Sequence, residues 1–182
     1  MEYSRTFPEI EYTEVKVPSV SFPEGPEDLT DASMEERRRK ILKQMEEKNL
    51  DSLLIYADRE HGGNFGYLTG FEPRFEEAAL ALHQDGTAVL LLGNENMKMA
   101  AYSRIPAGTV HVPYFSLPNQ PMEHQKTLCQ LIEDAGIRRG SRVGAVGWKL
   151  FTSRLEDNTQ LFDLPNFLLE ALRKAVGETG SV

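Results

Sequence analysis

The chain has 182 residues, of which 40% are hydrophobic and 26% are charged, a composition typical of a folded globular protein and unlike that of a wholly disordered chain. Its 28 acidic and 20 basic residues give a net charge of −8, which argues against a nucleic-acid partner held by bulk positive charge. The single cysteine excludes an internal disulfide and fits a cytoplasmic location, and no apolar stretch approaches the ~20 residues that a membrane span needs.

The first 30 residues differ from the rest of the chain. Residues 1–31 contain eight acidic and only two basic residues, and prolines at positions 8, 18, 23 and 26 disfavour both helix and central strand. We therefore expect an extended, acidic, proline-rich arm over residues 1–30 and one domain over residues 31–182. Apolar residues such as Val17 and Phe22 suggest that the arm lies on a surface, and a partly disordered leader is the alternative interpretation.

The domain opens with a predicted helix that begins near Ser33. Ser33 and Glu36 have the spacing of a capping box. An apolar stripe at helical period follows, made of Met34, Ile41, Leu42 and Met45. Asn49 can end this helix in the left-handed conformation. The basic run at 37–40 is flanked by glutamates, so we interpret it as a solvated helix face rather than a phosphate-binding patch.

Short apolar runs predict the strands of a sheet. Residues 52–56 form a nearly continuous apolar run, as expected for a strand that is buried on both faces. Residues 78–83 and 87–92 flank an Asp-Gly pair, and this pair between two apolar runs predicts a β-hairpin. Beyond the hairpin we expect a helix over residues 94–103 and a short strand over residues 110–113.

The second half of the chain is predicted to add two helices and one strand. Residues 122–135 carry a helical apolar stripe that stops at Gly136, and Pro165 is expected to open the last helix in its first turn. Residues 142–147 predict a strand whose glycines permit close packing. Because helices alternate with strands and one hairpin interrupts them, we predict an α/β fold with a mixed β-sheet flanked by helices.

Common catalytic and metal-binding motifs are missing from the sequence. It contains no G-x-S-x-G, H-E-x-x-H, P-loop or C-x-x-C motif. Cys129 lies beside a predicted helix stripe, and we interpret it as a small buried hydrophobe rather than a reactive thiolate. The four histidines show no ligand spacing. We therefore expect neither catalytic residues nor a metal site within this chain.

The richest polar cluster is the segment 58–77, directly after the predicted buried strand. It contains four glycines, five acidic residues, two arginines and one histidine. Loops that follow strands in α/β folds are common ligand sites, and a histidine beside carboxylates can act as an acid, a base or an anchor for a substrate carboxylate. The alternative is a long structured loop whose polar groups satisfy one another.

The same segment carries a recognisable motif. Residues 64–71 read Asn-Phe-Gly-Tyr-Leu-Thr-Gly-Phe, which resembles the Asn-x-x-Tyr-Leu-Thr-Gly-Phe motif of the creatinase/prolidase N-terminal domain. The predicted helices and strands follow the order of that family over residues 33–175, so the resemblance covers most of the domain but not the arm. In Xaa-Pro aminopeptidases, prolidases and creatinase, this domain precedes a catalytic "pita-bread" domain.

The resemblance implies a fold similar to ribonuclease H without the chemistry of that enzyme. It implies that the catalytic domain would begin near residue 177 and is absent here, together with its five ligands for two divalent metals such as Mn, Co or Zn; creatinase itself works without metal. The chain is then expected to be the non-catalytic N-terminal domain of a Xaa-Pro aminopeptidase-, prolidase- or creatinase-like hydrolase. Inactive alone, it would contribute to a homodimer and to the shaping of substrate access.

Two other functions stay open on the sequence. The same motifs fit a stand-alone binding or dimerisation module that has no hydrolase partner domain. A ribonuclease H-like nuclease ranks last, because it needs carboxylates clustered on neighbouring strands, whereas the predicted strands are mostly apolar.

By the same resemblance, the segment 58–77 would border the substrate pocket. His61 and Arg74 are the candidates for holding a substrate carboxylate through charge-assisted hydrogen bonds. Tyr67 and Phe71 would support them, and packing beneath the loop is their alternative role. The glycines of the segment would shape its tight turns.

Overall fold

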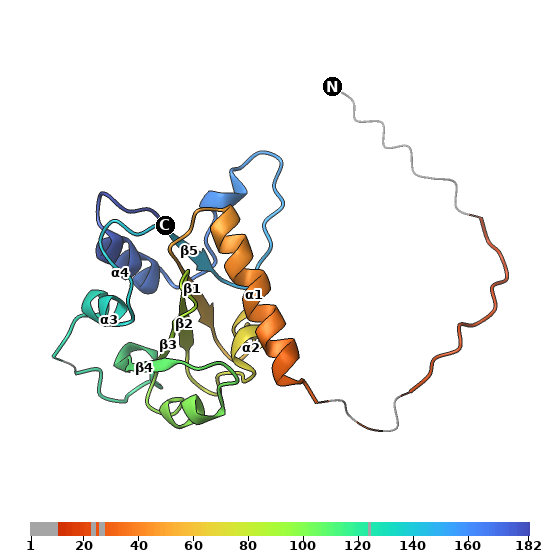
Figure 1. The fold of residues 1–182 in the computed structure, drawn as a ribbon, viewed down its shortest axis with the longest axis horizontal. Helices are drawn as coiled ribbons and strands as arrows, with labels where there is room; N and C mark the ends of the chain where they lie inside the picture. The colour runs from red at the N-terminus through yellow and green to blue at the C-terminus, as the bar shows by residue number, and fades with distance from the viewer. Residues whose placement is uncertain (1–10, 23–24, 26–27, 124) are drawn as a thin grey trace.

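The protein is built around a five-stranded mixed sheet with helices on both faces (Figure 1). The computed structural model describes residues 11–22, 25, 28–123 and 125–182. The strands are β1 (Ser52–Ala57), β2 (Ala78–His83), β3 (Ala88–Leu92), β4 (Gly108–His111) and β5 (Val143–Val146). The α-helices are α1 (Asp31–Glu47), α2 (Gly63–Thr69), α3 (Leu128–Asp134) and α4 (Asn166–Val176). This arrangement confirms the predicted α/β fold class.

The sheet combines parallel and antiparallel pairs in the order β4-β3-β2-β1-β5. β1 pairs antiparallel with β2 and parallel with β5, and β2 pairs antiparallel with β3. β3 pairs in parallel with β4, which is the last strand on its side of the sheet. The β2–β3 connection turns at Gly86 with a φ of 85°, so the hairpin that the Asp-Gly pair predicts is confirmed.

The sheet separates two hydrophobic cores, and β1 contributes to both. Leu54 and Tyr56 face the core that α3 and α4 cover. Leu53 and Ile55 face the other core, together with residues of α1 and α2. All six residues of β1 are buried, which explains why this strand has a continuous apolar run instead of alternating polar and apolar residues. The result is three layers, with helices above and below one sheet.

The first helix begins two residues earlier than predicted. α1 starts at Asp31, and its N-cap is Thr30, whose side chain accepts a hydrogen bond from the backbone N–H of Ser33 at 3.1 Å. The predicted cap at Ser33 is therefore wrong, because the earlier start brings Asp31 into the first turn, where its carboxylate is favoured and pairs with Arg104. Asn49 has a φ of 53° just after the helix, as predicted.

Two predicted helices are shorter than expected. Residues 94–103 hold only a 3₁₀ helix, η1 (Met97–Tyr102), which has no fully buried residue; Met97, Met99 and Ala100 are only partly buried against the core, so little packing is available to stabilise a longer α-helix. Within 122–135 the helix starts at Leu128, where burial of the apolar stripe also starts. Thr127 and Gln130 form a reciprocal capping box that fixes this start.

The remaining predicted elements are confirmed with small shifts. β4 ends at His111 rather than at residue 113, because Pro113 lacks a backbone N–H and begins the 3₁₀ turn η2 (Pro113–Phe115). β5 lies within the predicted range 142–147. α4 begins directly after Pro165, which occupies the N-cap position instead of the first turn.

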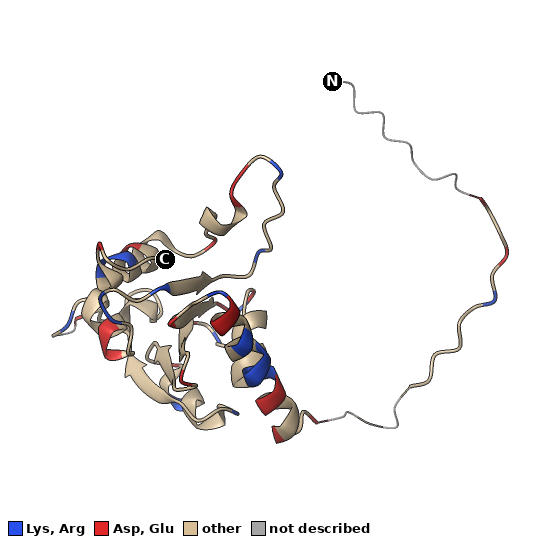
Figure 2. Ribbon diagram, turned by 45° about the horizontal axis from the view of Figure 1, so that its top comes forward, with Lys and Arg blue, Asp and Glu red and all other residues tan. Residues whose placement is uncertain are grey.

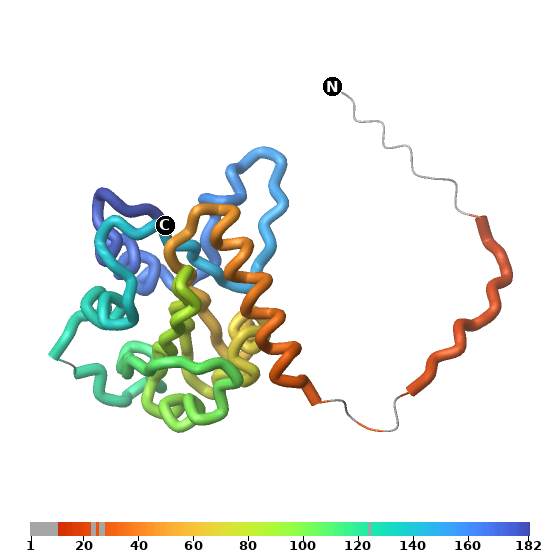
Figure 3. The backbone as a smooth tube through the Cα atoms, viewed as in Figure 1, coloured from red at the N-terminus to blue at the C-terminus, as the bar shows by residue number. Residues whose placement is uncertain are grey.

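The described part of the arm, residues 11–22, extends away from the body of the protein (Figure 3). It contains neither helix nor strand, and every one of these residues is exposed. Val17 and Phe22 are 84% and 85% exposed, so their apolar side chains contact little of the domain. Residues 11–22 therefore do not lie on the surface of their own domain, whereas Leu29, at the root of the arm, accepts a hydrogen bond from Arg104.

Acidic and basic residues are interleaved along α1 (Figure 2). Arg38 pairs with Glu35 at 3.0 Å, and Lys40 pairs with Glu36 at 2.7 Å. The basic run is thus part of a solvated helix face, as predicted. Across the described residues, every helix is too short or too polar to cross a lipid bilayer.

Candidate functional site

The motif at residues 64–71 builds the short helix α2 and fixes both of its ends, so the predicted loop over residues 58–77 contains a helix. Phe65 is fully buried beneath this helix. Gly70 ends it with a φ of 80°, and a Cβ at this position would overlap the side chain of Arg104. Asn64 donates a hydrogen bond to the carbonyl oxygen of Gly147 at 2.6 Å, which ties α2 to the end of β5.

His61 lies between a carboxylate and an aromatic ring. Its Nδ1 is 2.9 Å from Oδ1 of Asp58, and its backbone N–H donates to the same oxygen at 2.8 Å. The imidazole stacks on Trp148, with ring centroids 4.4 Å apart and an interplanar angle of 23°. Burial by itself raises the pKa of Asp58, but hydrogen bonds from His61 outweigh burial and lower that pKa. No described residue bonds Nε2 of His61, so this nitrogen can meet a ligand.

Phe75 is exposed and has two arginines against its ring. The guanidinium carbons of Arg59 and Arg74 lie 5.9 and 5.3 Å from the ring centroid. Phe75 has a φ of 69°, a left-handed conformation that is costly for a bulky residue, and 60% of the residue is exposed. Two guanidinium groups therefore gather at one exposed aromatic ring, an arrangement suited to binding a carboxylate.

A buried glutamate holds the backbone that carries Phe75. The carboxylate of Glu76 accepts hydrogen bonds from the backbone N–H groups of Glu95, Asn96 and Leu117 at 2.8, 3.2 and 3.3 Å. Only 4% of Glu76 is exposed, so these bonds satisfy a carboxylate that has little access to water. Glu76 thereby joins three loops and fixes the position of its neighbour.

A pocket of about 500 Å³ lies past the carboxyl end of β1, next to the two arginines. Its lining includes Tyr56, Asp58, Arg59, Phe75 and Glu77. The hydroxyl of Tyr56 donates to Oε1 of Glu77 at 2.6 Å. Burial raises the pKa of Glu77, and the nearby Asp58 adds to this, although the hydrogen bond from Tyr56 opposes it. The pocket lining thus combines one guanidinium group, that of Arg59, with four acidic side chains, and burial inclines the carboxyl group of Glu77 toward its neutral form.

The structure brings together only part of the site expected from the sequence. His61 and Arg74 reach the 500 Å³ pocket through Asp58 and Phe75, two lining residues that they contact. Neither His61 nor Arg74 is itself part of the lining. These contacts place the two candidates beside residues that line the pocket but outside the lining itself.

Tyr67 and Phe71 lie elsewhere, beside a separate pocket of about 450 Å³. The ring of Tyr67 is 4.5 Å from the guanidinium carbon of Arg37 on α1. Phe71 is buried and packs edge to face on Phe65, with ring centroids 5.2 Å apart. These contacts favour the alternative role of packing for both residues and separate them from His61.

Three residues of the site were missed by reasoning from the sequence. Arg59 and Phe75 belong to the segment 58–77, where a second arginine and another aromatic residue were available signals. The left-handed backbone of Phe75 has no signature in the sequence. Trp148 reaches His61 only because the parallel pairing of β1 and β5 brings the ends of these strands side by side.

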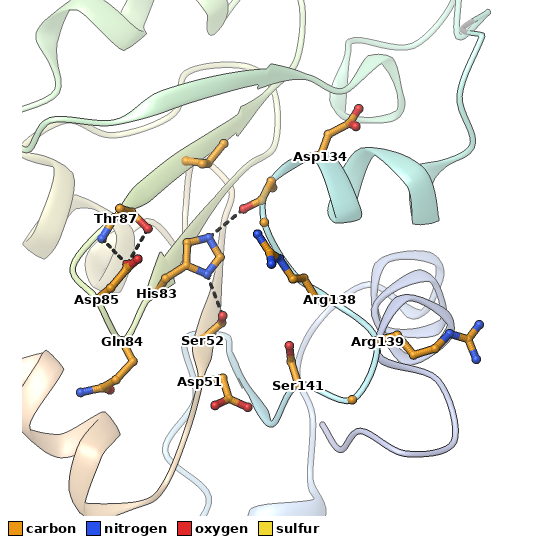
Figure 4. A pocket seen from close by; sticks show the side chains of 14 residues that line it. Asp51, Ser52, His83, Gln84, Asp85, Thr87, Asp134, Arg138, Arg139 and Ser141 are labelled. Carbon is orange, nitrogen blue, oxygen red and sulfur yellow. Dashed lines mark hydrogen bonds between the residues drawn. The ribbon is translucent and has the colours of Figure 1, made fainter.

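Another pocket, of about 730 Å³, lies at the other end of β1 (Figure 4). At its centre His83 donates from Nε2 to the carbonyl oxygen of Ala135 at 2.8 Å, so its Nδ1 accepts from the hydroxyl of Ser52 at 2.7 Å. Both ring nitrogens are thus engaged within the protein. His83 joins β1, β2 and the end of α3, and we assign it a structural role.

The described residues offer no ligand set for a metal ion. No group of three or more His, Cys, Asp or Glu side chains among them lies close enough together to hold one. The described residues therefore do not fit the two divalent metals that the resemblance implies for the catalytic domain.

The sequence matches the family model of the creatinase/prolidase N-terminal domain over residues 37–175. A search of curated proteins finds no match to the chain. Twenty-six chains of solved structures match it, with identities that show the shared fold alone.

Three of these structures illustrate the similarity. An N-terminal, creatinase/prolidase-like domain from Corynebacterium diphtheriae is 21% identical with a TM-score of 0.50, over 81% of this chain and 92% of that one. An Xaa-Pro aminopeptidase from Streptococcus pyogenes is 20% identical with a TM-score of 0.50, over 84% and 92%. The prolidase from Pyrococcus horikoshii OT3 is 18% identical with a TM-score of 0.50, over 80% of this chain but only 31% of that one.

Proposed function

Because the chain belongs to the creatinase/prolidase N-terminal domain family, we propose that it serves as the non-catalytic domain of an Xaa-Pro aminopeptidase-, prolidase- or creatinase-like hydrolase. In this proposal a pita-bread catalytic domain is its partner, the protein is a homodimer, and the chemistry takes place on the partner domain. The aminopeptidase and the prolidase among the similar structures support the assignment to this class of hydrolase.

The observation that carries the proposal is the pair of guanidinium groups at Phe75. A short peptide ends in a carboxylate, and two arginines can bind it by donating charge-assisted hydrogen bonds to its oxygens. Arg59 lines the 500 Å³ pocket, Arg74 contacts the ring of Phe75, which also lines it, and His61 contacts a third lining residue, Asp58. The domain would hold the carboxyl end of the substrate while the catalytic domain acts on the other end.

Such an anchor would select substrates by length. A peptide whose carboxylate is held at Arg59 and Arg74 places its scissile bond at a fixed distance from them. A longer peptide would put a backbone segment where the carboxylate belongs, and the two guanidinium groups would then lose their partner. The loss of charge-assisted hydrogen bonds, each worth about 1.5–3 kcal/mol when shielded from water, would disfavour the longer peptide.

A binding titration of the chain tests this role. The ¹⁵N-labelled chain is titrated with Ala-Pro and with Ala-Pro amide, which lacks the carboxylate, and chemical shifts are followed by NMR. We expect weak binding of the dipeptide, with Kd on the order of 1 mM because the site is open to water, and shifts confined to residues near Arg59, Arg74 and Trp148. The amide should bind several-fold more weakly.

Matched arginine variants control the titration. Arg59→Ala and Arg74→Ala should each weaken dipeptide binding several-fold, whereas Arg37→Ala, which removes an arginine from the α1–α2 side, should leave it unchanged. Equal binding of the dipeptide and its amide would reject the carboxylate site. Dipeptide binding without any catalytic partner encoded by the parent gene would favour a stand-alone binding module instead, and hydrolysis by the chain alone would contradict both functions.

A further inference from the structure

The arm has the residue pattern of a strand but no sheet to join. In residues 14–17 and 19–22, polar and apolar residues alternate, with Val15, Val17, Val20 and Phe22 as the apolar members and Pro18 between the two stretches. Period-two alternation is typical of a strand that has one face buried. Each of these four apolar residues is at least 66% exposed, so the face that the pattern prepares for burial is uncovered in the single copy.

The body of the protein offers a complementary surface. β4 is the last strand on its side of the sheet, and among the described residues it pairs with β3 only, so the outer edge of residues 108–110 can accept a further strand. Just beyond β4, an apolar groove of about 640 Å³ lies between α3 and α4, lined by side chains that include Tyr114, Met122, Leu128 and Phe167. Tyr114, which lines the groove, follows His111, the last residue of β4, by three residues.

The root of the arm lies beside the same edge of the sheet. Arg104 donates to the backbone oxygen of Leu29 at 2.9 Å and pairs with Asp31 at 2.7 Å, and it precedes the first residue of β4, Gly108, by only four residues. The seven steps from Leu29 back to Phe22 span at most about 24 Å. A copy related by a two-fold axis presents the same patch, so facing β4 edges would put each arm within reach of the other copy.

We propose that the arm docks on a second copy of this chain, with residues 19–22 adding a strand to the edge of β4 and residues 14–17 lying in the groove between α3 and α4. This inference rests on the homodimer proposed above and names the segment that builds it. A second copy is the occupant because the arm of the single copy points away from its own edge strand and groove (Figures 1 and 3).

Charge and size fit an exchange of arms. Glu170 and Lys174 of α4 both line the groove, and the segment that would lie there carries Lys16 and Glu14, so each charge of the segment has an opposite charge available. A stable dimer uses about 20–30 residues from each partner. Reciprocal exchange would supply the twelve described residues 11–22 and a comparable number from the edge and the groove of each copy, which reaches that range.

Sedimentation velocity of the full chain and two matched variants tests the exchange. Val20→Asp puts a charge on the apolar face of the arm, whereas Ser21→Asp puts the same charge on the opposite face of the same segment. We expect the wild-type chain to dimerise, Val20→Asp to raise the dimer dissociation constant at least tenfold, and Ser21→Asp to change it less than twofold. Because the arm is outside the folded body, neither substitution threatens folding.

A second pair of variants tests the groove. Met122→Asp, on an exposed residue that lines the groove, should weaken the dimer, whereas Leu155→Asp, on an exposed loop residue outside it, should not. A wild-type dimer that is insensitive to Val20→Asp would overturn the arm exchange and leave the homodimer standing. If the wild-type chain is a monomer at all concentrations, the arm exchange and the homodimer of this chain are both overturned. The same holds for a monomer whose arm is protected on its own body. The carboxylate site is tested separately by the dipeptide titration.

Discussion

A Cβ atom at position 136 would lie 2.6 Å from Nε2 of His83, the nitrogen that donates to the carbonyl oxygen of Ala135. Gly136 also has a φ of 92°, a conformation that residues with a side chain rarely adopt. The two constraints coincide because the chain must reverse tightly after α3 for the carbonyl of Ala135 to meet the imidazole. Gly136 and His83 therefore form one structural unit that fastens α3 to the sheet.

This unit predicts a large loss of stability in Gly136→Ala. The substitution adds backbone strain and pushes a methyl group into the imidazole, so we expect the free energy of unfolding to fall by about 3 kcal/mol in urea denaturation. Gly63→Ala is the matched control, because a Cβ there meets nothing within 4 Å and alanine favours the helix. Equal stabilities of the two variants would show that His83 does not need Gly136.

The buried strand β1 predicts a second difference in stability. Leu54 of β1 is fully buried in the core that α3 and α4 cover. Leu54→Ala should therefore leave a cavity and lower the free energy of unfolding by about 3 kcal/mol. Leu150→Ala removes the same atoms from a residue that is 86% exposed, and it should change stability by less than about 0.5 kcal/mol. If the two variants denatured alike, the assignment of β1 to the core would fail.

Local signals in the sequence were sufficient for most of the fold. The apolar run of β1, the Asp-Gly turn of the hairpin and the left-handed Asn49 each have one short-range physical cause, and each prediction is confirmed. The predicted start of α3 at Met122 is wrong because residues 123–127 are all polar, so no apolar stripe connects Met122 to Leu128. Only burial, which starts at Leu128, decides where the helix begins.

The candidate site was less accessible to sequence reasoning because it depends on contacts between distant segments. Residue type alone singles out His61 and Arg74, and each contacts a residue that lines the 500 Å³ pocket without lining the pocket itself. Nothing local indicates that Phe75 adopts a left-handed backbone, since the carboxylate of Glu76 fixes that loop through three segments. The stack of His61 on Trp148 likewise needs the β1–β5 pairing to be known first.

Glu77 predicts a pH dependence of stability. Burial raises its pKa in the folded state, so the folded protein binds more protons than the unfolded chain does above about pH 4.3, the ordinary pKa of a glutamate. The contribution of Glu77 to the free energy of unfolding should therefore fall as the pH rises from that value through the raised pKa. Glu77→Gln keeps an oxygen acceptor for Tyr56 but cannot titrate.

Urea denaturation of the wild type and Glu77→Gln across pH 4–8 measures this contribution as the difference between the two curves. The variant should gain in relative stability as the pH rises through the window. A constant difference between the two proteins over the whole range would mean that Glu77 titrates alike in the folded and unfolded states.

Trp148 is the only tryptophan of the chain, so its fluorescence reports directly on the candidate site. The imidazole of His61 covers one part of the indole, with ring centroids 4.4 Å apart, and about half of Trp148 is already exposed. His61→Ala removes this cover, and we expect the emission maximum to shift to longer wavelength as water reaches the ring. His61→Phe keeps a ring that can stack on the indole but cannot bond Asp58, so its emission maximum should stay near that of the wild type.

Tyr67→Phe, on the α1–α2 side, is the control and should leave the spectrum unchanged. An unshifted emission maximum in His61→Ala would show that the stack does not exist in solution. His61 would then no longer be placed beside the pocket, because the contact with Trp148 and the bond to Asp58 are what hold the imidazole there.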